Sequence, residues 1–476
     1  MENFEFENKK KKKIKKDAIY LCLCVVCLVI GGLGGYFVHD TFFKKQVPQD
    51  NQIYDEVAQT IENEFLDTAQ SDYSLQERML AGMVGMLGDP HSSYLTAKQA
   101  TDLGTSINGS FQGIGVTYIA VDAGAFILQV YKDTPAQKAG LMAGDIMTHV
   151  QGTSIAGYDT DKIKEMVQGK SGTEVQIKYI RNGKNYETKA IRGQVETSVA
   201  YEIQMTHNKK VGYLQITTFG SSIPNVVENI LKDMKEQGVE HLIIDLRGNG
   251  GGYLDAAQNL LNLFIPEGET MFRVQPYQGK EIIYQASSHQ KYQFKEGYIL
   301  VDKDSASASE VITGALKEIC HYHVVGDTTY GKGTVQTQKT LSNSDILKYT
   351  YAKWLTPNGT WVHGKGIQPD DEVHKTSLSD FHIVSMDKSY SFDQVEMQIA
   401  YMQEILKELN YSVDRTDGYF SLKTQEALKA FEKDYGLKQD GIYDKNDATI
   451  LLSALGYHIY HEVEDTQYQK VLELIQ

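Results

Sequence analysis

Cysteine is scarce in this chain of 476 residues. Only four cysteines occur, and three of them, Cys22, Cys24 and Cys27, lie in one apolar stretch near the N-terminus. Cys320 is therefore alone in the rest of the chain and has no partner there for an intrachain disulfide. The domains beyond the apolar stretch must be held by packing. At roughly 150 residues per domain, we expect about three domains.

Several well-known catalytic and cofactor motifs are also missing. The chain has no H-E-x-x-H, no paired C-x-x-C and no G-x-S-x-G, and none of its thirteen histidines is an obvious partner for a catalytic serine. The stretch "GDTTYGKGT" comes close to a phosphate-binding loop, but Gly333 stands where Ser or Thr should hold magnesium. The stretch "LRGNGGGY" fails the dinucleotide fingerprint because Tyr253 replaces its third glycine. We therefore expect no metal and no organic cofactor.

Positive charge is in deficit, with a formal net charge of −15 at pH 7. Binding of nucleic-acid phosphates requires clustered Lys and Arg, so this balance argues against a nucleic-acid partner. The one strong basic run, Lys9–Lys16, lies at the N-terminus.

A single long run without charge, residues 18–38, follows these lysines. It is long enough to cross about 30 Å of hydrocarbon as a helix. The lysines before it and Asp40 after it predict a cytoplasmic basic tail at 1–17 and place the rest of the chain outside. We thus expect a protein of the cell membrane with one transmembrane helix and extracytoplasmic domains. The alternative is a cleaved signal peptide with its cleavage region at Gly31–Gly35.

Four regions with different patterns of apolar residues follow this run, which predicts a multidomain fold. Residues 39–104 show helical periodicity. Residues 105–192 read as short strands with glycine turns, including the hairpin signal Asn182-Gly183. Residues 193–385 alternate strands and helices, which indicates an α/β core with a ligand site at the carboxyl ends of its strands. Residues 386–476 predict a small helical module with three helices and repeated Asp-Gly turns.

Three serines precede a predicted helix in "DSASASEVITGAL" at 304–316. A purely structural interpretation is available, because Ser307 and Glu310 have the spacing of a capping box at a helix start. A catalytic interpretation requires a base that can activate one of Ser305, Ser307 and Ser309.

Lysine is a known alternative to histidine as the base for a serine nucleophile. Lys332 lies 25 residues after Ser307, on the turn after the next strand, which an α/β sheet can return to the same edge. A lysine accepts the serine proton only if burial lowers its pKa to roughly 7–8. Gly331 and Gly333 on either side let the backbone bring the amine into a tight site.

The sequence from about residue 50 to 375 resembles the carboxyl-terminal processing peptidases, the tail-specific serine-lysine proteases. The resemblance is carried by "VGYLQITTF", "IIDLRGNGGG", "SASASE", "VVGDTTYGKGTVQ" and "LTPNGTWVHGKGIQPD", in the order of that family. It implies that Ser307 is the nucleophile, Lys332 the base and Gln336 a supporting residue, with Tyr330 replacing the usual Phe.

Peptide hydrolysis also needs two amide donors for the oxyanion of the intermediate. The resemblance implies the amide of Ala308 and one amide of the glycine run 250–252, for which Gly251 is our first choice.

Residues 105–192 resemble a PDZ domain. In such a domain the amides of Gly113, Ile114 and Gly115 would capture the terminal carboxylate of a peptide that adds to the sheet as a strand. Gln168 stands where the family has an arginine that helps to couple tail binding to the active site. This substitution puts such coupling in doubt.

Residues 386–476 resemble the peptidoglycan-binding fold, and two roles remain open for them, binding of peptidoglycan and contacts in a homodimer. Together the resemblances imply a membrane-anchored serine endopeptidase that cuts exported proteins with free C-termini near those termini. The alternative is a catalytically silent PDZ scaffold that binds the cell wall.

Overall fold

The computed structural model describes residues 51–66, 73–108, 110–196 and 198–475. The predicted basic tail and the predicted transmembrane helix at 18–38 lie outside the described residues. Within these ranges, no helix is both long and apolar enough to cross a membrane. The chain divides into two compact units, 1–80 and 81–476. The first contains α2 (Asn51–Glu64), and α3 (Leu75–Gly85) spans the boundary.

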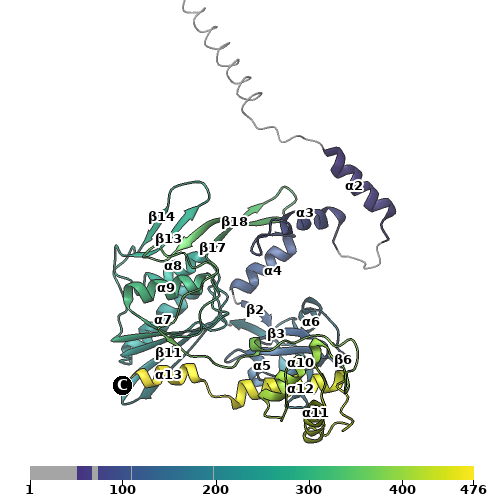
Figure 1. Cartoon of the computed structure of the whole chain (residues 1–476). Coiled ribbons are helices and arrows are strands. Elements are labelled where there is room, and N and C mark those ends of the chain that lie inside the picture. Colours follow the sequence, from purple (N-terminus) through teal and green to yellow (C-terminus); the bar gives the residue numbers. More distant parts are fainter. Residues whose placement is uncertain (1–50, 67–72, 109, 197, 476) are drawn as a thin grey trace, which may run out of the picture. The chain divides into compact units, whose positions relative to one another are not determined.

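The PDZ-like region, where Figure 1 labels β3 and β6, lies beside the helices of the C-terminal module. It forms a six-stranded antiparallel sheet in the order β3-β4-β5-β7-β8, with β6 paired to β5. Its strands are β3 (Val116–Val121), β4 (Gly124–Val130), β5 (Ile146–Val150), β6 (Thr153–Ser154), β7 (Glu174–Arg181) and β8 (Lys184–Ile191). Its helices are α5 (Pro135–Lys138) and α6 (Thr160–Val167). The predicted hairpin turn is confirmed, because β7 and β8 pair on either side of Asn182 and Gly183, both with positive φ.

A two-stranded ribbon connects this sheet to the rest of the unit. It pairs β2 (Ser110–Gly113), just before the sheet, with β9 (Gly193–Glu196), just after it.

The α/β core contains a six-stranded sheet in the order β10-β11-β12-β15-β16-β19. Its strands are β10 (Val199–Thr206), β11 (Lys209–Ile216), β12 (His241–Asp245), β15 (Glu296–Val301), β16 (His323–Gly326) and β19 (Asp371–Glu372). From β11 to β19 all neighbours are parallel. The connecting helices are α7 (Ile223–Glu236), α8 (Leu254–Leu261) and α9 (Ala308–Cys320). The predicted alternation of strands and helices is confirmed, and β12 is buried at every position, as expected for a central parallel strand.

A second sheet joins residues from distant parts of the unit. It contains β1 (Ser93–Leu95), β13 (Thr270–Pro276), β14 (Ile282–Gln285), β17 (Thr334–Thr340) and β18 (Ile346–Leu355). Strand β1 pairs with β18 and is followed by α4 (Ala97–Asn108). The sequence indicated only helix over 39–104, because a strand of three residues is too short to show an alternating pattern.

The C-terminal module contains the three expected helices, α10 (Met397–Glu408), α11 (Leu422–Asp434) and α12 (Lys445–Tyr457). Its core includes three side chains of the PDZ-like sheet, Phe126, Ile146 and Ile180. The module therefore packs directly on that sheet.

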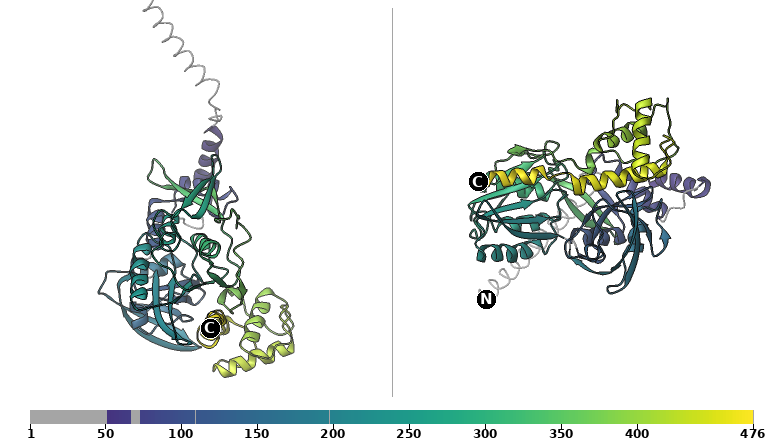
Figure 2. Two further views of the ribbon diagram at one scale, coloured as in Figure 1. Left: turned by 90° about the vertical axis from the view of Figure 1, so that its left-hand side faces the viewer. Right: turned by 90° about the horizontal axis from the view of Figure 1, so that it is seen from below.

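The last helix, α13 (Thr466–Leu474), packs elsewhere. Val471 and the following Ile475 are buried against Ile243, Leu300 and Val325 of the α/β sheet. The yellow C-terminal segment thus runs from the helical module to the teal strands of the core (Figure 2). The sequence boundary at 386–476 groups this helix with the module, whereas its contacts are with the core.

Candidate active site

The predicted catalytic residues meet in one cavity of about 470 Å³ at the carboxyl ends of the parallel strands. The cavity is lined by Gly251 after β12, by Ser307 and Ala308 after β15, and by Lys332 and Gln336 after β16. The α/β topology places these loops at the same edge, as the sequence predicted. Further walls come from α4, α8 and β18.

The three serines differ in exposure and in backbone conformation. Ser305 and Ser309 are fully buried, and their hydroxyls donate to the carbonyls of Leu246 and Asn249, both at 2.8 Å. Ser307 is half-buried and lines the cavity. Its φ of 57° and ψ of −113° lie outside the regions that L-residues normally occupy, so its backbone is strained. Strained residues of this kind are concentrated at functional sites. Ser307 is therefore the serine that can meet a substrate, and the other two are structural.

Burial lowers the pKa of Lys332, and the charge of Lys348 lowers it further, whereas Asp89 and Glu310 raise it. The backbone of Lys332 is held on both sides, because its N–H donates to Glu310 and its carbonyl accepts from the indole of Trp354 at 2.8 Å. Gly331 has a φ of 86°, and a Cβ there would lie 2.8 Å from the nitrogen of Gly366. The glycine is thus required for this path of the loop.

Glu310 connects the loop that carries Ser307, the serine loop, to the loop that carries Lys332, the lysine loop. One of its oxygens, Oε2, accepts the N–H groups of both Ser307 and Lys332 at 2.8 Å. The other, Oε1, accepts from the hydroxyl of Thr329 at 2.6 Å and from the N–H of Gly331 at 2.7 Å. The carboxylate is completely buried. The sequence identified Glu310 only as the partner of Ser307 in the capping box, which is present.

Gln336 lies on β17 in the wall of the cavity. Its Nε2 donates to the hydroxyls of Thr334 and Thr350, both at 3.0 Å. These bonds fix the amide plane beside the lysine loop.

The glycine run lies directly against the nucleophile. A Cβ on Gly251 would come within 2.9 Å of the Cβ of Ser307 and 3.0 Å of the nitrogen of Ala308, whereas a Cβ on Gly250 would meet nothing within 4 Å. The N–H of Gly251 donates to Oδ1 of Asn249 at 2.8 Å. Donation to a substrate oxyanion would require this bond to be exchanged.

A second group of residues near the lysine, in the "GDPHSSY" turn that leads into β1, could not be recognised from the sequence. His91 is half-buried, and burial followed by the positive charge of Lys332 lowers its pKa. Asp89 accepts from the hydroxyl of Ser92 at 2.6 Å, and Ser92 accepts from the N–H of Thr350 at 3.1 Å. This turn is therefore within electrostatic range of the lysine. Only the pairing of β1 with β18 brings it there, and no spacing in the sequence signals that pairing.

The predicted carboxylate-binding loop lies at the start of β3. Gly113, Ile114 and Gly115 are buried, and the carbonyls of Ile114 and Gly115 accept from Ala136 and Tyr131. Strand β3 is the first strand of its sheet, so that its outer edge has no neighbouring strand among the described residues. The hydroxyl of Tyr118 on β3 donates to the carbonyl of Thr160 at the start of α6. This bond connects β3, the strand with the open edge, directly to α6.

The fold defines a multidomain protein in which a PDZ-like sheet precedes an α/β core, and comparison with known families gives its class. Residues 210–373 match peptidase family S41, residues 112–191 match the PDZ domain, and residues 397–451 match the putative peptidoglycan binding domain.

Relatives of known name extend this match over most of the chain. A probable CtpA-like serine protease of Staphylococcus epidermidis is 35% identical over 392 residues, which cover 82% of this chain and 79% of that protein. The carboxy-terminal processing protease CtpB of Bacillus subtilis is 32% identical over 417 residues, covering 87% and 86%. Among solved structures, a photosystem II D1 C-terminal processing protease is 24% identical with a TM-score of 0.46, covering 71% of this chain and 86% of that one. The chain belongs to peptidase family S41 and is a serine-type C-terminal processing peptidase.

Proposed function

We propose that this peptidase cuts exported proteins near their C-termini, with Ser307 as the nucleophile and Lys332 as the general base. The observation that carries the proposal is the shared cavity, in which a single oxygen of Glu310 holds the backbone amides of both residues. The strained backbone of Ser307 and the lowered pKa of Lys332 support the two roles.

The reaction begins when neutral Lys332 takes the proton of Ser307 as Oγ bonds to the scissile carbonyl carbon. The carbonyl oxygen becomes an oxyanion that faces the amide of Ala308 and, after release by Asn249, the amide of Gly251. Collapse of this intermediate breaks the C–N bond, and the Lys332 ammonium protonates the leaving amine. Water then gives a proton to the neutral Lys332 amine as its oxygen bonds to the acyl carbon. The C–Oγ bond breaks, the new carboxyl terminus is released, and the Lys332 ammonium passes that proton to Oγ of Ser307.

Contact between the two catalytic groups forms with substrate. In the described part of the chain, no hydrogen bond joins the Ser307 hydroxyl to the Lys332 amine, and catalytic hydrogen bonds are often loose before substrate binds. The Nε2 of Gln336 is bound to two threonines, and its Oε1 is the atom with which we propose that it orients the lysine.

A direct test compares the full-length protein with Ser307→Ala on an unfolded protein that ends in apolar residues. We expect cleavage near the C-terminus by the wild type and none above background by the variant. Equal cleavage by both would exclude Ser307 as the nucleophile. Binding of the substrate without cleavage by the wild type would favour the silent scaffold instead.

We further propose that the PDZ domain recognises a free C-terminal carboxylate through the loop at Gly113, Ile114 and Gly115. Amidating the C-terminus of a peptide substrate should raise KM about tenfold or more, because the charge-assisted bonds to the loop amides are lost. The uncharged Gln168 at the end of α6 predicts that kcat changes little. The same peptide acetylated at its N-terminus is the control. Equal KM values for acid and amide would refute tail recognition.

We also propose that residues 18–38 anchor the protein in the cell membrane with its domains outside, and that the C-terminal module associates with peptidoglycan. The uncharged run and the match of residues 397–451 support these two proposals. Protease added to intact spheroplasts should digest the domains, and purified cell walls should retain the protein. Protection of the domains would refute the membrane anchor. A failure of the protein to sediment with the walls would refute the association with peptidoglycan.

A homodimer remains a prediction, which sedimentation of the intact protein can test.

A further inference from the structure

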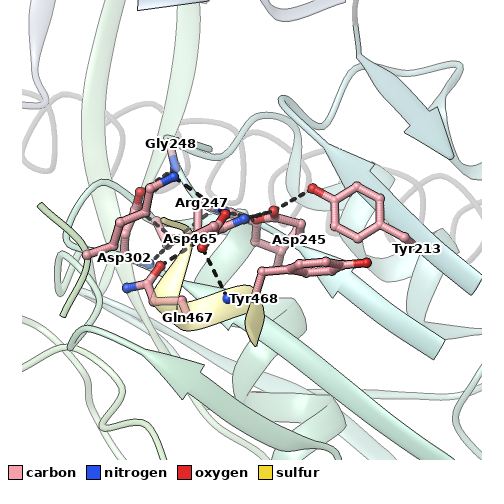
Figure 3. Close-up of polar contacts among 11 residues, drawn as sticks. Tyr213, Asp245, Arg247, Gly248, Asp302, Asp465, Gln467 and Tyr468 are labelled. Atoms are coloured by element: carbon pink, nitrogen blue, oxygen red, sulfur yellow. Dashed lines mark hydrogen bonds and ion pairs between the residues drawn. The ribbon is translucent and has the colours of Figure 1, made fainter. Parts of the chain in front are cut away.

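The first turn of α13 holds the arginine that precedes the glycine run. Arg247 donates through Nε and Nη2 to Asp245, at the end of β12. Through Nη1 it donates to both oxygens of Asp465, at 2.7 and 2.9 Å, and to Oε1 of Gln467 at 3.2 Å (Figure 3). The side chains of Arg247 and Asp245 are only 16% and 1% exposed. The arginine is thus fixed between a carboxylate of the core and a carboxylate of the C-terminal helix.

Gln467 extends these contacts to the loop that carries the lysine. It is almost fully buried, and its Nε2 donates to Oδ2 of Asp327 at 3.0 Å and to the carbonyl of Val373 at 2.9 Å. Asp327 follows directly after β16, five residues before Lys332. One side chain of α13 therefore touches both the glycine-run loop, through Arg247, and the lysine loop.

A third contact reaches the serine loop. The N–H of Gly248, next to Arg247, donates to both carboxylate oxygens of Asp302, at 3.0 and 2.9 Å. Asp302 also accepts from the hydroxyl of Ser305 at 3.1 Å, two residues before Ser307. These polar contacts connect the three loops that line the cavity to one another. The last residues in this set of contacts, Asp465 and Gln467, belong to the N-terminal end of α13.

The polar contacts of Asp465 and Gln467 can be removed without removing the apolar contacts that hold α13 on the core. Val471 and Ile475 anchor α13 through apolar burial in the core. Asp465 lies at the N-cap of the helix, where it accepts from the N–H of Tyr468 at 3.1 Å, a bond that asparagine can also accept. Although burial raises the pKa of Asp465, its bonds to Arg247 lower it below the ordinary value, so this carboxylate is charged in the neutral range.

We propose that Asp465 and Gln467 are positioning residues of the peptidase, which hold the glycine-run and lysine loops in register through Arg247 and Asp327. This inference rests on the proposed roles of Ser307 and Lys332. It gives the C-terminal segment a part in catalysis that is separate from binding of cell wall, although the segment lies more than 130 residues after the catalytic lysine.

The test measures how fast, and how completely, a fluorophosphonate labels Ser307 in the full-length protein. In that reaction Oγ bonds to phosphorus, fluoride leaves and the serine proton passes to the base. We expect Asp465→Asn to label to the same final extent as the wild type but about 10 to 100 times more slowly. In peptide cleavage kcat should fall by the same factor, with KM within threefold. Gln467→Met, which keeps the volume but loses the polar contacts, should behave similarly.

The matched control is Asp417→Asn, which removes a carboxylate from the exposed Arg415–Asp417 pair of the helical module. It should label within twofold of the wild-type rate. A wild-type rate in both Asp465→Asn and Gln467→Met would overturn the inference. So would a lower final extent of labelling at an unchanged rate, because that result indicates only fewer folded molecules. Failure of the wild type itself to label at Ser307 would instead refute the proposed function.

Discussion

Lys332→Arg is expected to be as inactive as Lys332→Ala, with kcat at least about 10³-fold below the wild type in both. Arginine keeps the positive charge but does not deprotonate in the accessible pH range, so it cannot take the proton of Ser307. The contacts that place residue 332, from Glu310 and Trp354, involve only its backbone and are available to both variants. The measurement is steady-state cleavage of a peptide, with circular dichroism to confirm the fold.

The pH dependence of wild-type activity provides a second test of Lys332 as the base. In the proposed mechanism the neutral amine is the active form, and burial lowers the pKa of Lys332 below its ordinary value. Activity should therefore rise with pH through this lowered pKa and then reach a plateau. Removing the positive charge of Lys348 should raise the pKa of Lys332 and move the rise to higher pH.

His91 supplies the control for this prediction, because it is a histidine within electrostatic range of the lysine. His91→Ala should keep the fold and most of the activity. Full activity in Lys332→Arg, together with loss of activity in His91→Ala, would transfer the role of base to the histidine.

Glu310→Gln is expected to cost about 100-fold in kcat and about 3 kcal/mol in the free energy of unfolding. The carboxylate accepts from four donors, two on each oxygen. An amide places its NH₂ group against two of these donors, which leaves them unpaired in a buried site. Whichever way the amide turns, at least one backbone N–H of the lysine loop, that of Gly331 or that of Lys332, loses its acceptor.

The same substitution should shift the pH profile. The negative charge of Glu310 stabilises the ammonium form and so raises the pKa of Lys332. Without that charge the midpoint of the remaining activity should move to lower pH.

Glu432→Gln is the matched control, because Glu432 is also a fully buried carboxylate and accepts from the N–H of Gly441 in the C-terminal module. It should lower the free energy of unfolding but keep kcat within about threefold. Equal losses of kcat in the two variants at equal stability would show that Glu310 acts only on the fold.

Local sequence patterns predicted much of the fold. The alternating strands and helices of the core, the turn at Asn182-Gly183 and the three helices of the C-terminal module all follow from periodicity and turn residues. The pairing of β1 with β18 and the docking of α13 on the core could not be predicted in this way. Each depends on segments more than 90 residues apart, whose contacts leave no local pattern.

The residues of the candidate site also divide into those that the sequence predicted and those that it could not predict. Ser307, Lys332 and Gln336 were identified from motifs, and the structure places all three in one cavity. The capping box explained the spacing of Ser307 and Glu310 but not the two further donors that reach Glu310 from the lysine loop, nor the hydroxyl of Thr329. Those partners lie about 20 residues away and meet the carboxylate only because parallel strands end at a common edge.

Whether Lys332 activates Ser307 can be determined from the position of a covalent label. The full-length protein is treated with a fluorophosphonate, digested and mapped by mass spectrometry. If Lys332 is the base, one adduct forms, on Ser307, in the wild type and in His91→Ala, and none forms in Lys332→Ala, Lys332→Arg or Ser307→Ala. An adduct on another serine, or rapid labelling of Ser307 in Lys332→Arg, would exclude this role of Lys332.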